Sequence, residues 1–164
     1  MTNPDSSQDA LVIDRTFDAT IGHIWQLWTV PEHFQAWYGP TGVSIPVAKM
    51  DVRVGGTRLI CMEMPTPNGL MQMWFTGEYL EVVENQRLVY TESISDEDGK
   101  PATPAGVDTP TEHQVTEVRV ELEDVDGRTR MVMTHVGIPA DSSGATGWTM
   151  ALDKLAAYIE SNDG

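Results

Sequence analysis

The stretch WTMALDKLAAYIE, residues 148–160, decides the fold of this chain. Its apolar side chains recur every three or four residues, which places them on one stripe of an α-helix. They are Trp148, Ala151, Leu152, Leu155, Ala156 and Ile159. Most of the preceding chain has the patterns of β-strands, and a sheet with one apolar face needs a second layer to cover it. We therefore expect this helix to lie across a curved antiparallel sheet, with any pocket between the two layers.

Outward from this helix, the chain has the pattern of strands joined by short turns. The strands are expected at residues 10–18, 43–54, 57–64, 70–83, 86–95, 113–124 and 128–136. Two short helices are expected between the first two strands, one over 21–28 with Asp18 or Thr20 as its cap and one beginning at Pro31. Gly77 inside a strand suggests a bulge or bend. The prediction is an α+β helix-grip fold, with about seven antiparallel strands wrapped around a long C-terminal helix.

The chain has 164 residues, with 10 Lys and Arg against 25 Asp and Glu, so its formal net charge is −15. This charge disfavours nucleic acid and anionic membranes as partners, because both need clustered basic residues. The N-terminus has no signal-peptide pattern, and no apolar run is long enough to span a membrane. We expect a cytoplasmic protein with one domain at 10–162, a disordered tail at 1–9 and a mobile surface loop at 96–112.

Several short motifs together resemble one protein superfamily. They are Trp25-x-x-Trp28, Pro31-Glu32, Trp37-Tyr38-Gly39-Pro40, Asp51-x-Arg53-x-Gly55-Gly56, Gly77-x-Tyr79-x-Glu81-Val82, Arg87-Leu88-Val89-Tyr90, Thr116-Glu117-Val118 and Gly147-Trp148. On these residues the chain is similar to the SRPBCC superfamily (START-like, with the birch-pollen-allergen fold). Within it, the chain resembles the group homologous to the C-terminal domain of activators of the 90-kDa heat-shock chaperone ATPase.

The resemblance covers residues 10–162 and implies the helix-grip fold. It implies no particular activity, because members of this group share neither a catalytic triad nor a metal site. They include co-chaperone domains and proteins that bind hydrophobic ligands.

Nine methionines suggest either an adaptable cavity wall or a methionine-rich core, since both have the same sequence pattern. Met62 and Met64, Met71 and Met73, and Met131 and Met133 are spaced by two, so each pair lies on one face of its strand. Four tryptophans (25, 28, 37 and 148) are expected to gather where the short helices meet the long one, as core anchors or as a pocket mouth. The candidate ligand-binding residues are Trp28, Trp37, Met62, Met64, Met73, Phe75, Met131, Met133, His135, Trp148 and Leu152.

His135 continues the face of Met131 and Met133, so it could act as a general base, orient a ligand carbonyl, or serve as a hydrogen-bonded structural histidine. No two of the four histidines have metal-binding spacing, and we expect neither a metal nor a cofactor. Asp14 and Glu63 are expected to form solvated ion pairs with Arg15 or Arg58.

Three functions fit these patterns. The favoured one is a domain without catalytic activity that binds a hydrophobic small molecule between the sheet and the last helix. A co-chaperone-like interaction module, with a chaperone or a second copy of the chain as its partner, would work through its surface with a filled core. An enzyme of the cyclase or dehydratase kind would need a cavity and a titrating group such as His135.

Overall fold

The computed structural model describes residues 10–39, 42–100, 115–137 and 143–162. Within them, one sheet contains β1 (Ala10–Phe17), β2 (Ser44–Met50), β3 (Thr57–Thr66), β4 (Gly69–Val83), β5 (Arg87–Ser95), β6 (Thr116–Val125) and β7 (Arg128–Val136). The strand order is β1-β7-β6-β5-β4-β3-β2, and every neighbouring pair is antiparallel. Strands β2 to β7 therefore form a meander, to which β1 adds beside β7. The seven-stranded antiparallel sheet is confirmed.

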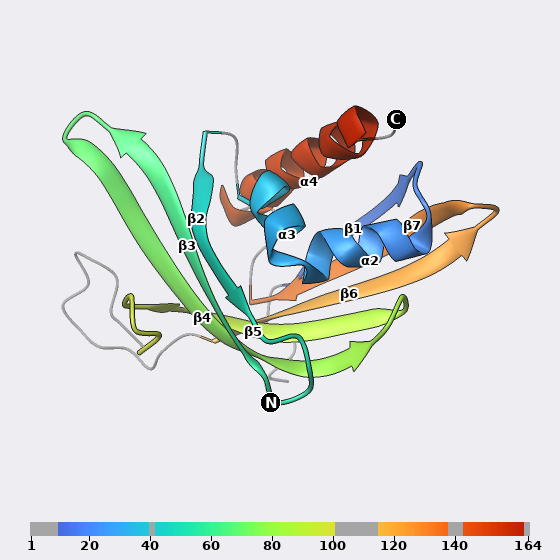
Figure 1. Cartoon of the computed structure of the whole chain (residues 1–164), viewed down its shortest axis with the longest axis horizontal. Helices are drawn as coiled ribbons and strands as arrows, with labels where there is room; N and C mark the ends of the chain where they lie inside the picture. Colours follow the sequence, from blue (N-terminus) through green and yellow to red (C-terminus); the bar gives the residue numbers. More distant parts are fainter. Residues whose placement is uncertain (1–9, 40–41, 101–114, 138–142, 163–164) are drawn as a thin grey trace, which may run out of the picture.

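Three helices accompany the sheet: α2 (Ile21–Thr29), α3 (Pro31–Trp37) and α4 (Ser143–Asn162). Thr20 caps α2, since its hydroxyl accepts a hydrogen bond from the backbone N–H of His23. Val30 precedes α3 and offers no side-chain cap, so Pro31 at the first helical position sets that start. The sheet curves around the helices, and α4 crosses its concave side (Figure 1). The helix-grip fold is confirmed, although α4 begins five residues before the predicted start at Trp148.

Strand β2 is shorter than predicted, because it ends at Met50 instead of residue 54. The backbone N–H of Asp51 bonds to the carbonyl of Thr57, and the N–H of Arg53 bonds back to the carbonyl of Asp51. A Cβ atom on Gly56 would lie 2.0 Å from the carbonyl oxygen of Asp51. This tight turn therefore needs glycine and stops the strand.

Gly77 allows a close approach between strands, and the bulge suggested there as an alternative to a bend is not at this residue. It pairs regularly with Arg58 of β3, and the register shift of β4 lies between Tyr79 and Glu81. A Cβ atom at Gly77 would lie 1.8 Å from the carbonyl oxygen of Thr91, so only glycine fits there.

The core lies between the concave face of the sheet and the helices. Leu152 and Leu155 of α4 are fully buried, as the helical stripe predicts. The Trp28 ring lies 4.8 Å from that of Trp37 and 6.0 Å from that of Trp148, measured between centroids. The expected gathering of tryptophans is confirmed for these three, and it anchors the start of α4 against α2 and α3.

The remaining predictions about order concern residues that the structure does not describe. The tail 1–9 and residues 101–112 of the predicted surface loop lie outside the described residues. The described part of that loop, Asp96–Lys100, is a turn in which the Asp96 carboxylate accepts hydrogen bonds from the backbone N–H groups of Asp98 and Lys100.

Candidate functional site

Five of the predicted site residues lie in a closed part of the core. Their side chains are at most 1% exposed, so protein atoms surround them on all sides. They are Trp28, Trp37, Met131, Met133 and Leu152. A ligand could reach them only if the core opened, and their part in binding stays a prediction.

His135 is held in a chain of hydrogen bonds that uses both ring nitrogens. The indole N–H of Trp148 donates to Nδ1 at 2.8 Å, and an indole can only donate. The proton of the neutral ring is therefore on Nε2, which lies 2.8 Å from Oγ1 of Thr116, and that hydroxyl donates to the carbonyl of Glu92 at 3.1 Å.

The chemical environment of His135 fits a structural residue better than a general base. Burial lowers its pKa, and the negative charge of Glu92 opposes this effect only in part. The neutral ring has no nitrogen free for a ligand. Among the alternatives weighed for His135, the hydrogen bonds favour the structural one.

The other methionines form a surface that is half open to solvent. Met62 pairs with Met73 and Met64 pairs with Met71 across β3 and β4. Cross-strand partners lie on the same face of a sheet, here the face of the buried Ile60. Met71 is 41% exposed and Met73 is 37% exposed, whereas Met62 and Met64 are partly buried. We call these four residues the methionine face.

The methionine face brings together sites that the sequence analysis had predicted separately. Phe75 pairs with Ile60 and is partly buried beside it. Met71 was noted as the partner of Met73 in spacing but was not among the predicted site residues. The far end of the β3–β4 hairpin projects beyond the helices, which leaves this part of the interior face uncovered by them (Figure 1).

A buried arginine is the main site feature that the sequence analysis missed. Arg58 is only 2% exposed, and its guanidinium carbon lies 3.7 Å from the ring centroid of Tyr90. The rings of Phe34 and Tyr79 are 5.2 and 5.9 Å away. The prediction of a surface ion pair for Arg58 is wrong. Strand alternation could have indicated this, because Arg58 shares its face with Ile60.

The acids assigned to Arg15 and Arg58 have other partners. Asp14 pairs with Arg130 at 2.5 Å, and Glu63 accepts a hydrogen bond from the side-chain amide of Gln72. Arg15 instead reaches Asp153 of α4, at 2.8 Å. These contacts are exposed and contribute little to stability.

Three polar atoms around Arg58 are buried without a hydrogen-bond partner among the described residues: its own Nε and the hydroxyls of Tyr79 and Tyr90. Burial raises the pKa of both tyrosines, although the charge of Arg58 works against this, so both phenols keep their protons. We call Arg58, Tyr79 and Tyr90 the arginine cluster. Next to it, the hydroxyl of Tyr38 donates to Glu92 at 3.0 Å.

Gly77 explains how Arg58 reaches Tyr90. Between β3 and β4, Arg58 pairs with Gly77. Between β4 and β5, Thr76 pairs with Ser93, so the next residue of β4, Gly77, lies opposite Glu92. A Cβ atom at Gly77 would lie 3.3 Å from Cγ of Arg58. The missing side chain lets the arginine lean across β4 toward the tyrosines of β4 and β5.

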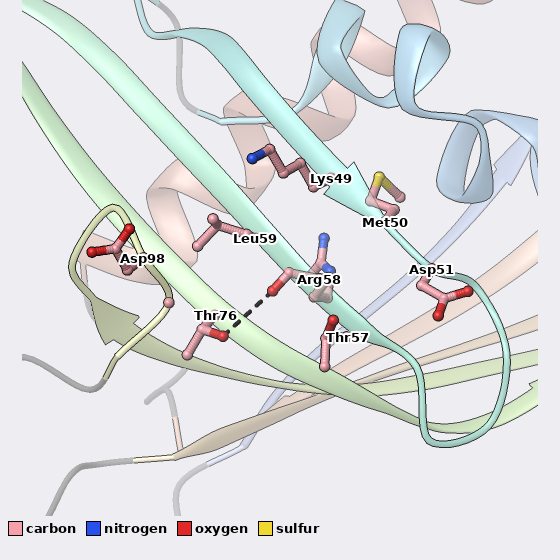
Figure 2. A pocket seen from close by; sticks show the side chains of 9 residues that line it. Lys49, Met50, Asp51, Thr57, Arg58, Leu59, Thr76 and Asp98 are labelled. Carbon is pink, nitrogen blue, oxygen red and sulfur yellow. Dashed lines mark hydrogen bonds between the residues drawn. The ribbon is translucent and has the colours of Figure 1, made fainter.

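A cavity of about 540 Å³ lies on the other face of β2, β3 and β4, beside the turn at Asp98 (Figure 2). It is lined by Lys49, Met50, Asp51, Thr57, Arg58, Leu59, Thr76, Asp98 and Gly99. Figure 2 shows the hydroxyl of Thr76 directed at the carbonyl of Arg58. Apart from the buried Arg58, the lining residues are exposed or half-buried, and they include both charge signs. The sequence analysis did not predict this pocket.

Two further observations concern only the described part of the chain. It contains no group of three or more His, Cys, Asp or Glu side chains placed to hold a metal ion. None of its helices has the length and apolar character needed to span a membrane.

The curved antiparallel sheet with a long helix across it and two short helices after the first strand defines a helix-grip domain. The model of one family, the Activator of Hsp90 ATPase homolog 1-like proteins, matches residues 18–160, and the chain belongs to this family. The resemblance inferred from the motifs is confirmed.

Solved structures show the same fold. A protein from Nitrosomonas europaea has a TM-score of 0.73 at 22% identity, covering 94% of this chain and 96% of its own. A protein from Mycobacterium smegmatis has a TM-score of 0.73 at 24% identity, and the match covers 92% of this chain and 90% of that protein. The AHSA1 protein from Silicibacter pomeroyi has a TM-score of 0.69 at 20% identity, and the match covers 92% of this chain and 97% of that protein. No curated protein matches the sequence.

Proposed function

We propose that this protein binds a small molecule with a hydrophobic body, and that the methionine face is where that body lies. The observation that carries the proposal is the pairing of four methionines in register on the interior face of the sheet, two of them exposed. Exposed apolar patches of this kind mark sites where a ligand or partner binds. Methionine side chains are flexible and polarisable, so they adapt to ligands of varied shape.

The packing of the core favours this location over the space under α4. Leu152 and Met133 are fully buried, and a ligand there would have to displace protein atoms. At the methionine face the apolar atoms are already in contact with water, so covering them releases that water at no cost in core packing. The function is therefore a binding function, with the closed part of the core under α4 as its scaffold.

A co-chaperone role is the second candidate, and the family description favours it. A protein partner could cover the same methionine face, because aromatic residues and methionine are enriched at protein interfaces. In that case the protein would stimulate a chaperone ATPase and would bind small apolar molecules weakly. The two candidates differ in what protects the methionines from solvent.

The neutral dye Nile red tests the proposal, because its fluorescence rises in apolar surroundings. The double variant Met71→Gln with Met73→Gln should bind the dye about tenfold more weakly, since a loss of about 1.4 kcal/mol of contact is a factor of ten. Val54→Gln is the matched control, because Val54 is an exposed apolar residue in the turn after β2. Equal dye binding by the double variant and the control would contradict the proposal. Stimulation of a chaperone ATPase that the double variant abolishes would favour the co-chaperone role.

A further inference from the structure

Arg58 is a buried cation that forms no close ion pair among the described residues. Its side chain is 98% buried, since 2% is exposed, and no carboxylate of the described residues lies within 4.0 Å of its guanidinium. Removing a charge from water is costly unless an opposite charge and hydrogen bonds compensate. The ring of Tyr90 compensates in part by a cation–π contact.

The nearby carboxylate of Glu92 compensates this charge only from a distance: it helps to raise the pKa of Arg58 but forms no ion pair with the guanidinium. It belongs to a partly buried side chain, and its Oε2 accepts the hydroxyl of Tyr38 at 3.0 Å. The guanidinium of Arg58 therefore has no direct anionic contact among the described residues.

The unpartnered atoms of the arginine cluster define what that group should be. Nε of Arg58 can only donate a hydrogen bond, and the protonated hydroxyls of Tyr79 and Tyr90 can each donate one as well. Three donors from the adjoining strands β3, β4 and β5 match an acceptor with several lone pairs and a negative charge. A carboxylate has two such oxygens and suits a guanidinium in geometry and charge.

We propose that the arginine cluster holds the carboxylate of an amphipathic ligand whose apolar body extends along β3 to the methionine face. This inference rests on the proposed function, and it names the polar end of the same ligand. Arg58, Ile60, Met62 and Met64 alternate on one face of β3. Arg58 and Met62 are four residues apart, about 13 Å at the rise of a strand, which suits a medium-length acyl chain.

Arg58 and Ile60 are closed off from solvent in the structure, so this part of the site would have to open for the ligand. Ile60 between the two ends is fully buried, so the ligand body must displace what covers it. Met62 and Met64 beside it are unbranched and only partly buried, so they can change conformation more readily than the buried, branched Ile60. Entry from the methionine face toward Arg58 is therefore the expected route.

Two probes of equal length test the inference with the full-length protein: decanoate and decan-1-ol, each measured by displacement of Nile red. The double variant Tyr79→Phe with Tyr90→Phe removes two unpartnered hydroxyls and keeps both rings, so the fold is retained. Tyr158→Phe is the matched control, because its hydroxyl bonds to His33 of α3, away from the cluster. Arg58→Met removes all guanidinium donors, and the tyrosine variant decides the matter if that protein fails to fold.

The wild-type protein should bind decanoate at least tenfold more tightly than decan-1-ol. The double tyrosine variant should lose about tenfold in decanoate affinity while its affinity for decan-1-ol and the behaviour of Tyr158→Phe stay unchanged. Equal affinity for both probes, or a double variant that changes the melting temperature but not the ratio of affinities, would overturn the inference. In that case the cluster would hold only buried water, and the proposed function would stand. Binding of neither probe would overturn both.

Discussion

The hydrogen bonds of His135 predict a pH dependence of folding. Burial lowers the pKa of His135 in the folded protein, whereas in the unfolded chain it titrates near 6.5. Below about pH 6.5 the unfolded chain therefore binds more protons, and the free energy of unfolding falls as the pH falls. Stability from this residue is fully present above that pH.

The groups that face the ring are Trp148 of α4, Thr116 of β6 and Glu92 of β5. Urea unfolding at pH 7.5 and 5.5 should show that the free energy of unfolding is lower at pH 5.5. His135 should contribute at most about 1.4 kcal/mol per pH unit to this loss. His135→Gln should show a smaller loss over the same interval. An identical pH dependence in both proteins would mean that His135 is not held neutral.

Removing the hydroxyl of Tyr90 or of Tyr38 should have opposite effects on stability. Tyr90→Phe without ligand should leave the free energy of unfolding unchanged or raise it by about 1 kcal/mol, because its hydroxyl has no partner to lose. Tyr38→Phe should lower it by about 1 kcal/mol, because Glu92 loses a donor. Chemical denaturation of the two variants distinguishes these outcomes. A loss for Tyr90→Phe as large as for Tyr38→Phe would show that its hydroxyl is bonded.

At the scale of the element, the two glycines Gly77 and Gly22 should respond oppositely to alanine. A Cβ atom at Gly77 would meet the backbone of Thr91, so Gly77→Ala should cost about 3 kcal/mol or more. Gly22 in α2 has nothing within 4 Å of such an atom, and Gly22→Ala should stabilise the helix by a few tenths of a kcal/mol. Thermal melting of both proteins measures the difference, and a neutral Gly77→Ala would contradict the close approach of β4 and β5.

The packing of α4 predicts the effect of filling the space beneath it. Leu152 is fully buried, so Leu152→Trp should overpack the core and cost about 1–3 kcal/mol. Nile red binding at the methionine face should be retained in the fraction that stays folded. A stable variant with reduced dye binding would instead place the cavity under α4.

At the scale of the molecule, periodicity predicted the elements and their order. Buried side chains recur every two residues in a strand and every three to four residues in a helix, so the sequence itself shows which element each stretch forms. It could not give the end of β2, since the turn after Met50 depends on backbone hydrogen bonds that composition does not show. The methionine face could be predicted only as separate pairs. Its register, with Met62 opposite Met73, comes from the ladder between β3 and β4.

The arginine cluster shows a different limit of prediction. A charged residue is expected at the surface by default, and Arg58 was assigned there. Its place in the core depends on Gly77 and on two tyrosines from neighbouring strands, which are separate in the sequence and meet only in the sheet. The pocket beside Asp98 likewise needs the turn after β5 to fold back over β3.

The central claim is that a hydrophobic ligand lies on the methionine face while the part of the core under α4 stays closed. The most direct test is NMR of the protein with ¹³C-labelled methionine methyl groups, titrated with decan-1-ol and assigned by single substitutions. The account predicts that the signals of Met62, Met64, Met71 and Met73 shift with the titration, and that those of Met131 and Met133 do not. Shifts confined to the two core methionines, or no shift at all, would contradict it.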